Sequence, residues 1–419
     1  MAMMKGMQRR TFLSASAAAL MPYAAEAQDG MTSIFDGATL NGWSVQQGPA
    51  SAFYVSEGSI SVSDSANFPT WLRFDRPLET FDFSCEFYVK GWIDSAVYIH
   101  APLYGPAQEC GFAIKLFHKQ ETPKPESMGA VFPLIAPKLV NVKSKGDWNS
   151  LRIVMDWPKL QVWSNGEIVQ DLNVESHPDL RYRLRSGYLG LQSLSYPIRF
   201  RNLRLKQLPS KLQWQILYSA PSDIEKWKVV EGKPRFQTFG ETLKGDGLGH
   251  LGTKQTFKDF DLELYVRASK HSNGGVLFRA EGAGSEPHYE IQLHDVEGAV
   301  YPTGSLYGYR RAKYPRIQPE EWYLFQLHVQ DRHCLVRING ETVVDYPALD
   351  RVTPGMIILQ AHDGPRWIEY QQIRIRPLKL VRTERIAGAM LAAFPKQEPG
   401  RSSWLEIRCA HKAHQQSGC

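Results

Sequence analysis

The 419-residue chain is long enough for two domains of ordinary size, and its composition, 43% hydrophobic and 22% charged, is that of a globular protein. The formal net charge of +6 comes from the first 27 residues and from the tail 379–419, so the body between them is close to neutral. A neutral body argues against nucleic acid as a partner.

The first 27 residues have the pattern of a secretory signal peptide. A basic start is followed by an apolar run over residues 12–25 and by the small-x-small ending Ala25-Glu26-Ala27. The pair Arg9-Arg10, with Phe12 and Leu13 after it, favours a twin-arginine signal over an ordinary signal peptide that happens to hold two arginines. We therefore expect a periplasmic or secreted protein. No later segment approaches the roughly 20 apolar residues that a transmembrane helix needs.

The body, residues 28–378, consists of short alternating runs of apolar and polar residues, which predict an all-β fold. Asn165-Gly166 between two such runs is a strong signal for a tight hairpin. The same landmarks then return in the same order: residues 82–89 match 259–266, Asn165-Gly166 matches Asn339-Gly340, and residues 187–192 match 355–360. This order predicts a tandem duplication, with a first β-sandwich over residues 28–209, a second over 210–378 and a basic tail over 379–419.

The five cysteines include no CxxC pair and therefore no zinc-site spacing. Outside the cytoplasm disulfides are permitted, and Cys85–Cys110 or Cys409–Cys419 could form. The alternative, which we prefer for Cys85 and Cys334, is that they are small buried hydrophobic residues within strands.

One predicted strand carries a candidate site. In residues 289–295, Ile291 and Leu293 are expected to face a core, which puts Glu290, Gln292 and His294 in a row on the other face. The strand-like run before it ends in Arg279, so the row would combine a carboxylate, an amide, an imidazole and a guanidinium. The alternative is a buried hydrogen-bond network that holds two sheets together, and for His294 alone we favour a structural role.

The two copies keep the strand pattern and differ in this polar row. The counterparts of Glu290, Gln292 and Arg279 in the first copy are Ala113, Lys115 and His100. Core pattern follows packing, whereas polar identity follows chemistry. We therefore expect that the copies have diverged in function and that only the second holds the full row.

Several motifs give the chain a family resemblance. Residues 34–43, Ile-Phe-Asp-Gly-Ala-Thr-Leu-Asn-Gly-Trp, resemble the start of the 3-keto-disaccharide hydrolase domain. The second copy resembles its interior in Asn273-Gly274-Gly275, Tyr289-Glu290-Ile291-Gln292, residues 303–307 and residues 359–364. The resemblance covers about residues 32–378 as two copies, of which the first has a degenerate interior. It implies two tandem concanavalin A-like (jelly-roll) β-sandwiches that bind ligands on a concave sheet or its rim.

The resemblance also implies a chemistry, namely hydrolysis of glycosides already oxidised to a ketone at C3. A base removes the acidified C2 hydrogen, an acid assists departure of the C1 substituent, and water adds back. Glu290 and His362 would be the base and acid in either order, and Arg279 or a metal ion would hold the enolate. Sugar hydroxyls would be bound by Asn273, Gln292, Tyr307 and Gln360.

No spacing in the chain demands a cofactor, although Asp295, together with Glu290 or His362, is a candidate ligand for a divalent cation. Whether a sugar 3-oxidoreductase first makes the 3-keto substrate is left open. The main alternative is a non-catalytic carbohydrate-binding protein with a lectin-like sandwich, in which some of the 11 tryptophans stack on sugar rings. A third reading is a scaffold or interaction protein.

Overall fold

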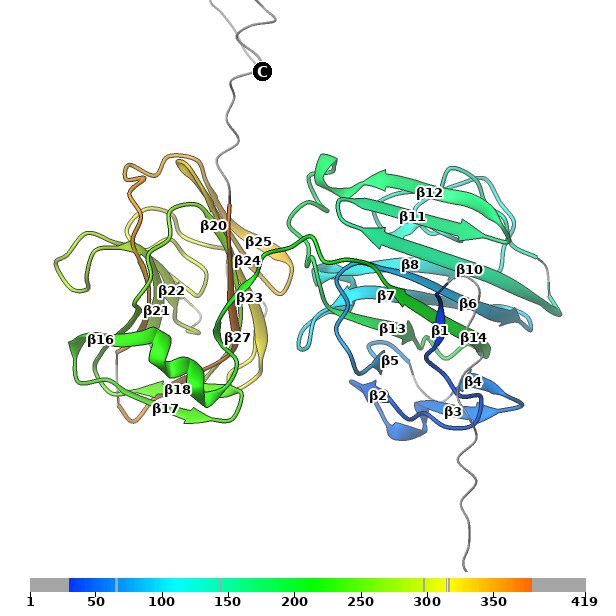
Figure 1. Cartoon of the computed structure of the whole chain (residues 1–419), viewed down its shortest axis with the longest axis horizontal. Coiled ribbons are helices and arrows are strands. Elements are labelled where there is room, and N and C mark those ends of the chain that lie inside the picture. The colour runs from blue at the N-terminus through cyan, green and yellow to red at the C-terminus, as the bar shows by residue number, and fades with distance from the viewer. Residues whose placement is uncertain are drawn as a thin grey trace, which may run out of the picture. The chain divides into compact units, whose positions relative to one another are not determined.

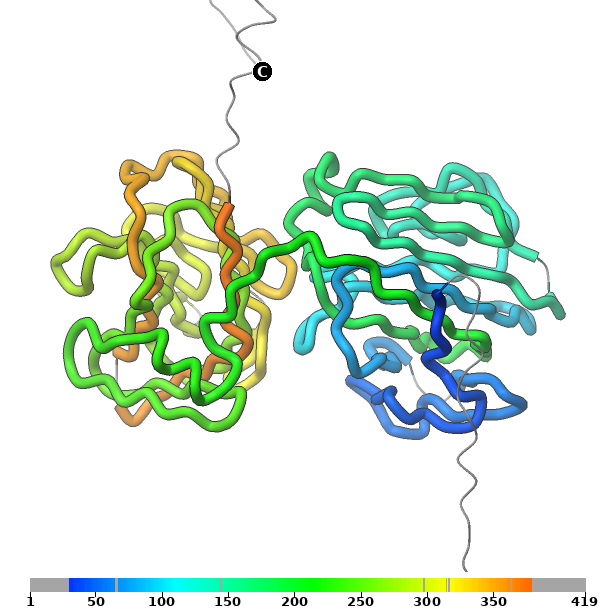
Figure 2. Tube along the Cα trace, in the orientation of Figure 1, coloured from blue at the N-terminus to red at the C-terminus, as the bar shows by residue number. Residues whose placement is uncertain are grey.

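The structure is a computed structural model that describes residues 30–378, apart from residues 65–66, 144, 297, 314, 316 and 363. The described residues belong to one compact unit that contains two β-sandwiches (Figure 1). In Figure 2 the trace runs from blue to green through the first sandwich and from green to orange through the second. The predicted signal peptide, the tail 379–419 and the cysteines Cys409 and Cys419 lie outside the described residues.

The first sandwich consists of an eight-stranded and a six-stranded sheet. The order in the larger sheet is β12 (Glu167–Asn173), β11 (Lys159–Ser164), β10 (Asp147–Asp156), β6 (Phe81–Val89), β14 (Ile198–Gln207), β4 (Ser59–Val62) and β3 (Phe53–Ser56), with β1 (Thr32–Ser33) beside β14. The order in the smaller sheet is β2 (Trp43–Gln46), β5 (Trp71–Phe74), β13 (Tyr188–Gln192), β7 (Asp94–Ala101), β8 (Phe112–Phe117) and β9 (Val131–Phe132).

The second sandwich repeats this plan with an eight-stranded and a five-stranded sheet. The larger sheet contains β17 (Arg235–Phe239), β18 (Thr242–Asp246), β27 (Trp367–Pro377), β20 (Phe260–Ala268), β23 (Tyr323–Gln330), β24 (His333–Ile338) and β25 (Glu341–Tyr346), with β15 (Gln215–Tyr218) beside β27. The smaller sheet contains β16 (Trp227–Gly232), β19 (Gly249–Thr253), β26 (Met356–Ala361), β21 (Gly274–Ala280) and β22 (Tyr289–Leu293). The all-β expectation is confirmed.

Helical structure in the described residues is limited to α1 (Ala107–Cys110) and the short 3₁₀ segments Ala50–Ala52, Val174–Ser176 and Pro221–Lys226. None of these is long and apolar enough to cross a membrane.

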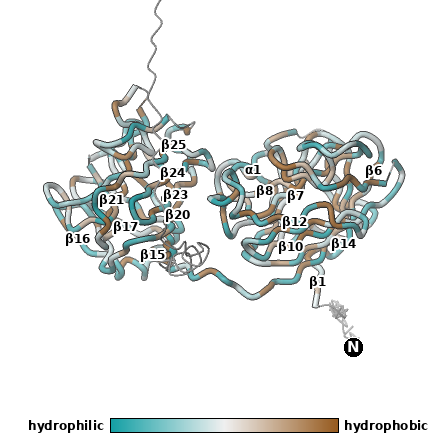
Figure 3. Tube along the Cα trace, turned by 90° about the horizontal axis from the view of Figure 1, so that it is seen from above, coloured by the Kyte–Doolittle hydropathy of each residue, from teal (hydrophilic) through white to brown (hydrophobic). Residues whose placement is uncertain are grey.

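Alternation of side chains explains why these runs are strands that cover a core. In β6 the residues Phe81, Phe83, Cys85, Phe87 and Val89 are buried, and the residues between them lie on the opposite face. Successive side chains of a strand point to opposite faces, so a period of two places one set between the sheets. Each sandwich has its own hydrophobic core, and Figure 3 shows hydrophobic and hydrophilic residues interspersed along both.

The predicted hairpins and the predicted repeat are both visible in the backbone. Asn165-Gly166 joins β11 to β12 and Asn339-Gly340 joins β24 to β25, each pair with positive φ at both residues, as a tight turn of this type requires. Leu78 forms an antiparallel bridge with Gly187 in the first sandwich, and Phe257 forms the same bridge with Gly355 in the second. This pairing makes Phe81 the counterpart of Phe260, so the sequence match of residues 82–89 with 259–266 is shifted by two residues.

The disulfide Cys85–Cys110 is not formed, because both cysteines are free and buried. Cys85 points into the core of the first sandwich, whereas Cys110 packs against Leu184, Tyr265 and Leu324. The preferred alternative for Cys85 and Cys334, small buried residues within strands, is confirmed.

The first sandwich covers the outer face of β20 in the second. The ring of Tyr104 stacks on Trp322 at 5.4 Å, and the backbone N–H of Leu103 donates to the Tyr265 hydroxyl at 2.8 Å. Consequently β20 has buried residues on both faces in its middle, from Leu262 to Val266, whereas β6 is buried on one face only along most of its length.

Candidate functional site

The candidate site lies on the outer face of the five-stranded sheet in the second sandwich. In β22 the side chains of Tyr289, Ile291 and Leu293 enter the core, as the alternation predicts. Glu290 and Gln292 therefore stand on the opposite face. His294 follows the end of the strand, and its Nδ1 lies 2.9 Å from the carbonyl oxygen of Ser272, a structural contact.

Strand register assembles a polar row across this face. His250 on β19 pairs with Gln360 on β26, which pairs with Gly275 on β21, which pairs with Gln292 on β22. Residues directly opposite each other in adjacent strands share a face, so these four positions form one line. Glu290 lies in the next line, beside the buried Leu277.

The carboxyl group of Glu290 leans over Gly275. A Cβ atom on Gly275 would lie 2.2 Å from Glu290 Oε1, so only glycine leaves room for the carboxyl group. Among the described residues no hydrogen bond or ion pair to this carboxyl group is found. Burial raises its pKa from 4.5 to about 7, because the charged form is poorly solvated there. Glu290 can therefore both give and take a proton near neutral pH.

Two amides flank the Glu290 carboxyl group. Gln292 Nε2 donates to Asn273 Oδ1 at 2.5 Å, which holds both side chains at the start of β21 and the end of β22. Gln360 Nε2 donates to His250 Nε2 at 3.2 Å. Asn273, Gln292 and Gln360 were each predicted to bind sugar hydroxyls, and the structure brings all three to one face.

His250 and Glu231 were missed by the sequence reading. His250 Nδ1 lies 3.3 Å from Glu231 Oε2, an electrostatic contact whose hydrogen is poorly aligned with the oxygen. Burial lowers the pKa of His250, and the charge of Glu231 partly opposes this. The alternation of residues 249–253 marks a strand, but no local signal indicates which distant strand lies beside it.

Tyr307 and His362 lie at the border of the face. The backbone N–H of Tyr307 donates to the carbonyl oxygen of Glu290 at 2.9 Å, and the Tyr307 ring, which is exposed, lies 5.0 Å from that of Tyr301. His362 is exposed just beyond β26, close enough for its charge to lower the pKa of His250. Both predicted residues are therefore near the row, although neither contacts Glu290 through its side chain in the described structure.

Arg279 is not brought to this face. A bulge between Leu277 and Ala280 and a φ of 46° at Arg279 break the alternation of β21. The fully buried guanidinium group pairs with Asp259 at 3.0 Å and donates to the carbonyl oxygens of Lys258 and Arg351. Its counterpart His100 has a φ of 51° and likewise contacts two backbone carbonyl oxygens, so both residues hold the fold together.

Asp295 is also separate from Glu290. It accepts a hydrogen bond from Thr303, burial raises its pKa, and its charge acts on the buried Tyr323. Within the described residues no group of three or more His, Cys, Asp or Glu side chains could hold a metal ion, and Asp363 lies outside them. A divalent cation stays a prediction.

The equivalent face of the first sandwich has no carboxyl group at the position of Glu290. Ala113 stands in the place of Glu290, and Trp71 stands in the place of His250. These residues pack with Ala96 and Tyr98, and the rings of Trp71 and Tyr98 are 5.7 Å apart. Lys115 and Asp94 form an ion pair where the second sandwich has Gln292 and Asn273. At the positions of Glu290 and His250 the first face is thus covered by apolar side chains.

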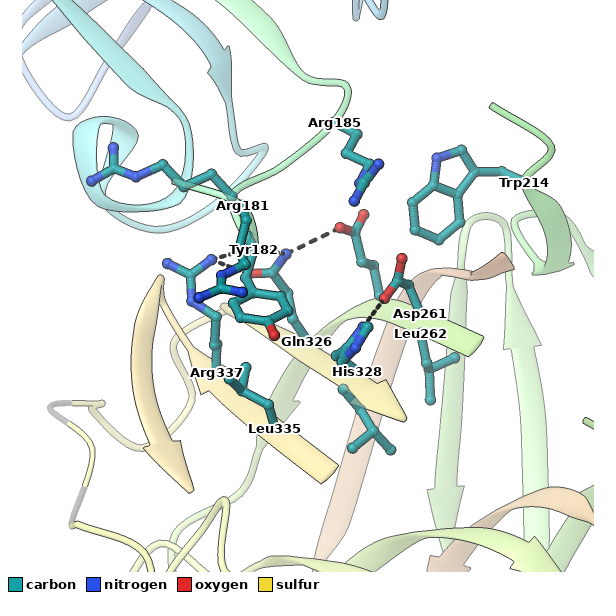
Figure 4. Close-up of a pocket in the computed structure, with 13 residues that line it drawn as sticks. Arg181, Tyr182, Arg185, Trp214, Asp261, Leu262, Gln326, His328, Leu335 and Arg337 are labelled. Atoms are coloured by element: carbon teal, nitrogen blue, oxygen red, sulfur yellow. Dashed lines mark hydrogen bonds and ion pairs between the residues drawn. The ribbon is translucent and has the colours of Figure 1, made fainter. Parts of the chain in front are cut away.

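A cavity of about 370 Å³ including open solvent lies away from this face, where the first sandwich meets β20, β23 and β24 (Figure 4). Several polar side chains that line it contact one another. His328 Nδ1 lies 2.6 Å from Asp261 Oδ1, and Glu263 accepts a hydrogen bond from Gln326 at 3.0 Å. Arg337 donates to the carbonyl oxygen of Tyr182 in the first sandwich. No predicted site residue lines this cavity, and its contacts join the two sandwiches.

Comparison with known proteins gives one family match that covers most of the chain. The model of the 3-keto-alpha-glucoside-1,2-lyase-like domain matches residues 30–206 and again residues 213–376. No curated protein matches the chain.

Solved structures match one part of the chain at a time. A proposed glycosyl hydrolase of Parabacteroides distasonis is 18% identical, with 43% of this chain and 95% of that one covered and a TM-score of 0.38. The carbohydrate-binding module CBM66 of Bacillus subtilis is 16% identical, with 36% and 95% covered and a TM-score of 0.28. The lumenal domain of VIP36 is 12% identical, with 45% and 92% covered and a TM-score of 0.30. Likenesses this weak say nothing about what the present chain binds.

Proposed function

The chain belongs to the 3-keto-alpha-glucoside-1,2-lyase-like family, and from this premise we propose that it cleaves 3-keto-glycosides on the outer face of the five-stranded sheet in the second sandwich. The observation that carries the proposal is the carboxyl group of Glu290. It has no partner among the described residues, it lies over Gly275, and its pKa of about 7 suits proton transfer at neutral pH. Carbohydrate, in the form of a 3-keto-glycoside, is the proposed partner.

The elimination step requires two proton transfers. The ketone at C3 acidifies the hydrogen on C2, and its removal allows a C1=C2 double bond to form as the bond from C1 to the leaving oxygen breaks. The leaving oxygen takes a proton, and water then adds its hydroxyl group to C1 and its proton to C2. Gln292 and Gln360 have side-chain groups suited to sugar hydroxyls on either side of Glu290.

The location of the protein is a further part of this proposal. The twin-arginine pattern of residues 9–13 supports export of the folded protein to the periplasm or beyond. Export is tested by fractionating cells that express the full chain and the variant with Arg9 and Arg10 replaced by lysine, which is expected to stay in the cytoplasm.

The activity is tested by incubating the full chain with a 3-keto-glucoside and measuring the free 3-keto-sugar released. Glu290→Gln is expected to lose roughly 10²–10⁴-fold in rate, the usual contribution of a positioned acid or base. Glu225→Gln, an exposed glutamate of the same sandwich, is the matched control and should keep full activity. A wild-type chain that releases nothing but is retarded on a polysaccharide affinity gel would instead be a carbohydrate-binding protein.

A further inference from the structure

His250 occupies a position that neither the motifs nor the family match assigns. It lies on β19, directly opposite Gln360, in the polar row that ends at Gln292. Its side chain is 12% exposed, so it belongs to the face and not to the surrounding surface. One strand, β26, lies between β19 and β21, where the Glu290 carboxyl group lies over Gly275, so the two are two strand spacings apart. At about 4.8 Å per strand the span is roughly 10 Å, enough for a sugar ring between the two side chains.

The contacts of His250 define which ring nitrogen carries the proton. With the Gln360 amide in its assigned orientation, Nε2 of Gln360 donates to Nε2 of His250, so this ring nitrogen is an acceptor. The proton of the neutral ring is then on Nδ1, which faces the carboxylate of Glu231 at 3.3 Å. A carboxylate facing one ring nitrogen favours the tautomer that has its proton there. The other nitrogen, Nε2, can take a proton from a bound sugar once the sugar displaces the Gln360 amide from it.

We propose that Nε2 of His250, oriented by Glu231, takes the C2 proton of the 3-keto-sugar and that Glu290 protonates the leaving oxygen. This assignment rests on the proposed function and deepens it. The C2–H electrons form the C1=C2 bond, the C1–O bond breaks, and the proton of Glu290 goes to the leaving group. In the return step water gives a proton to the Glu290 carboxylate and its hydroxyl group to C1, while the imidazolium returns its proton to C2.

The electrostatics of the face suit these two roles. Burial lowers the pKa of His250, to which the nearby His288 and His362 also contribute, while Glu231 raises it. The balance keeps the ring neutral at pH 7, as a base must be. Burial raises the pKa of Glu290 to about 7, so a fraction of its carboxyl groups stays protonated at the same pH. Two groups with pKa values displaced in opposite senses provide an acid and a base on one face.

The first sandwich supplies an independent observation. It retains the strands and the glutamine of the row, because Gln192 stands where the second sandwich has Gln360. His250 and Glu290 both have counterparts that cannot transfer protons. Trp71 stands in the place of His250, and Ala113 stands in the place of Glu290. Two residues that act in the same reaction are expected to be lost together, and the first sandwich lacks both.

The test separates the two proton transfers. A 3-keto-sugar that has deuterium on C2 and no leaving group at C1 reports only the base, through loss of deuterium to water followed by NMR. Cleavage of a 3-keto-glucoside reports both groups. His250→Gln is expected to lose 10²-fold or more in both readouts, whereas Glu290→Gln should keep the exchange and lose the cleavage. His271→Gln, at an exposed position, is the matched control and should change neither.

Glu231 is a positioning residue, and its test needs a different readout. Glu231→Gln is expected to lower kcat by less than His250→Gln does and to shift the acidic limb of the pH profile of exchange to lower pH, because the carboxylate raises the pKa of the imidazole. A purely structural role would change thermal stability and leave that limb in place.

Several outcomes would overturn the assignment. Wild-type exchange in a folded His250→Gln variant would remove His250 from the reaction and leave the proposed function intact. Loss of exchange in Glu290→Gln with exchange retained in His250→Gln would reverse the roles. A wild-type chain that neither exchanges nor cleaves would overturn the proposed function and this assignment with it.

Discussion

Glu290 Oε1 occupies the space that a side chain on Gly275 would need, since a Cβ atom there would be 2.2 Å away. This relationship explains the Asn-Gly-Gly motif at residues 273–275 physically. Asn273 holds Gln292, and Gly275 makes room for the carboxyl group that stands over the sheet. The motif and the glutamate are thus parts of one arrangement, although they belong to different strands.

Gly275→Ala is therefore expected to displace the Glu290 carboxyl group and lower the rate of 3-keto-glycoside cleavage by at least tenfold. The side chain of Glu290 is flexible, so it can move away at a cost in stability of about 1 kcal/mol. Activity assays and thermal unfolding check both parts. Gly91→Ala, with open space around its Cβ position, is the control. Full activity in Gly275→Ala would contradict the placement of Glu290.

The stability of the protein should depend on the protonation of Glu290. Its pKa is raised from 4.5 to about 7 in the folded state, so the folded state binds the proton more tightly than the unfolded state does. The contribution is fully favourable below pH 4.5 and is lost as the pH rises through 7; a pKa difference of this size corresponds to about 3 kcal/mol at most. In Glu290→Gln, which has no carboxyl group at this position, stability should not fall in this way as the pH rises.

Unfolding by urea at pH 5 and pH 8 measures this difference. Relative to the wild type, Glu290→Gln should gain stability on going from pH 5 to pH 8, while Glu225→Gln should follow the wild type. In parallel, cleavage by the wild type should fall as the pH rises above about 7, because the acid form of Glu290 disappears. A pH dependence of unfolding that is identical in Glu290→Gln and wild type would refute the raised pKa.

Arg279→Ala is expected to destabilise the fold by about 3–5 kcal/mol, because it leaves the buried carboxylate of Asp259 without its cation. The carbonyl oxygens of Lys258 and Arg351 lose their donors as well. Urea unfolding checks the change. If instead Arg279→Ala keeps wild-type stability and raises KM for the keto-sugar without changing kcat, Arg279 binds the substrate.

Two glutamates test the contact between the sandwiches. Glu263 is buried against Arg374 where the first sandwich covers β20, so Glu263→Ala is expected to cost about 3–5 kcal/mol. Glu86 pairs with Arg201 on a partly exposed face, and Glu86→Ala should cost at most about 1 kcal/mol. Differential scanning calorimetry compares the two. Equal costs would show that the cover over Glu263 does not form in solution.

Local alternation was sufficient to predict the all-β fold and the face on which Glu290 and Gln292 stand, whereas the hairpins came from the Asn-Gly pairs and the two sandwiches from the repeated landmarks and the family resemblance. A period of two depends only on neighbours in the chain, so residues 81–89 and 289–293 carry it in their own sequence. The family motifs then identified Asn273 and Gln360 as members of the same site, which the strand register places together.

The sequence by itself therefore determined the fold class, the repeat and the polar face of β22, because each is encoded in residues close together in the chain. Only the tertiary structure decided the rest of the site. The pairing of β19 with β26 brings His250 into the row from 40 residues before Glu290, and the bulge in β21 turns Arg279 away from it. Both depend on long-range strand pairing and on burial, which no local pattern contains.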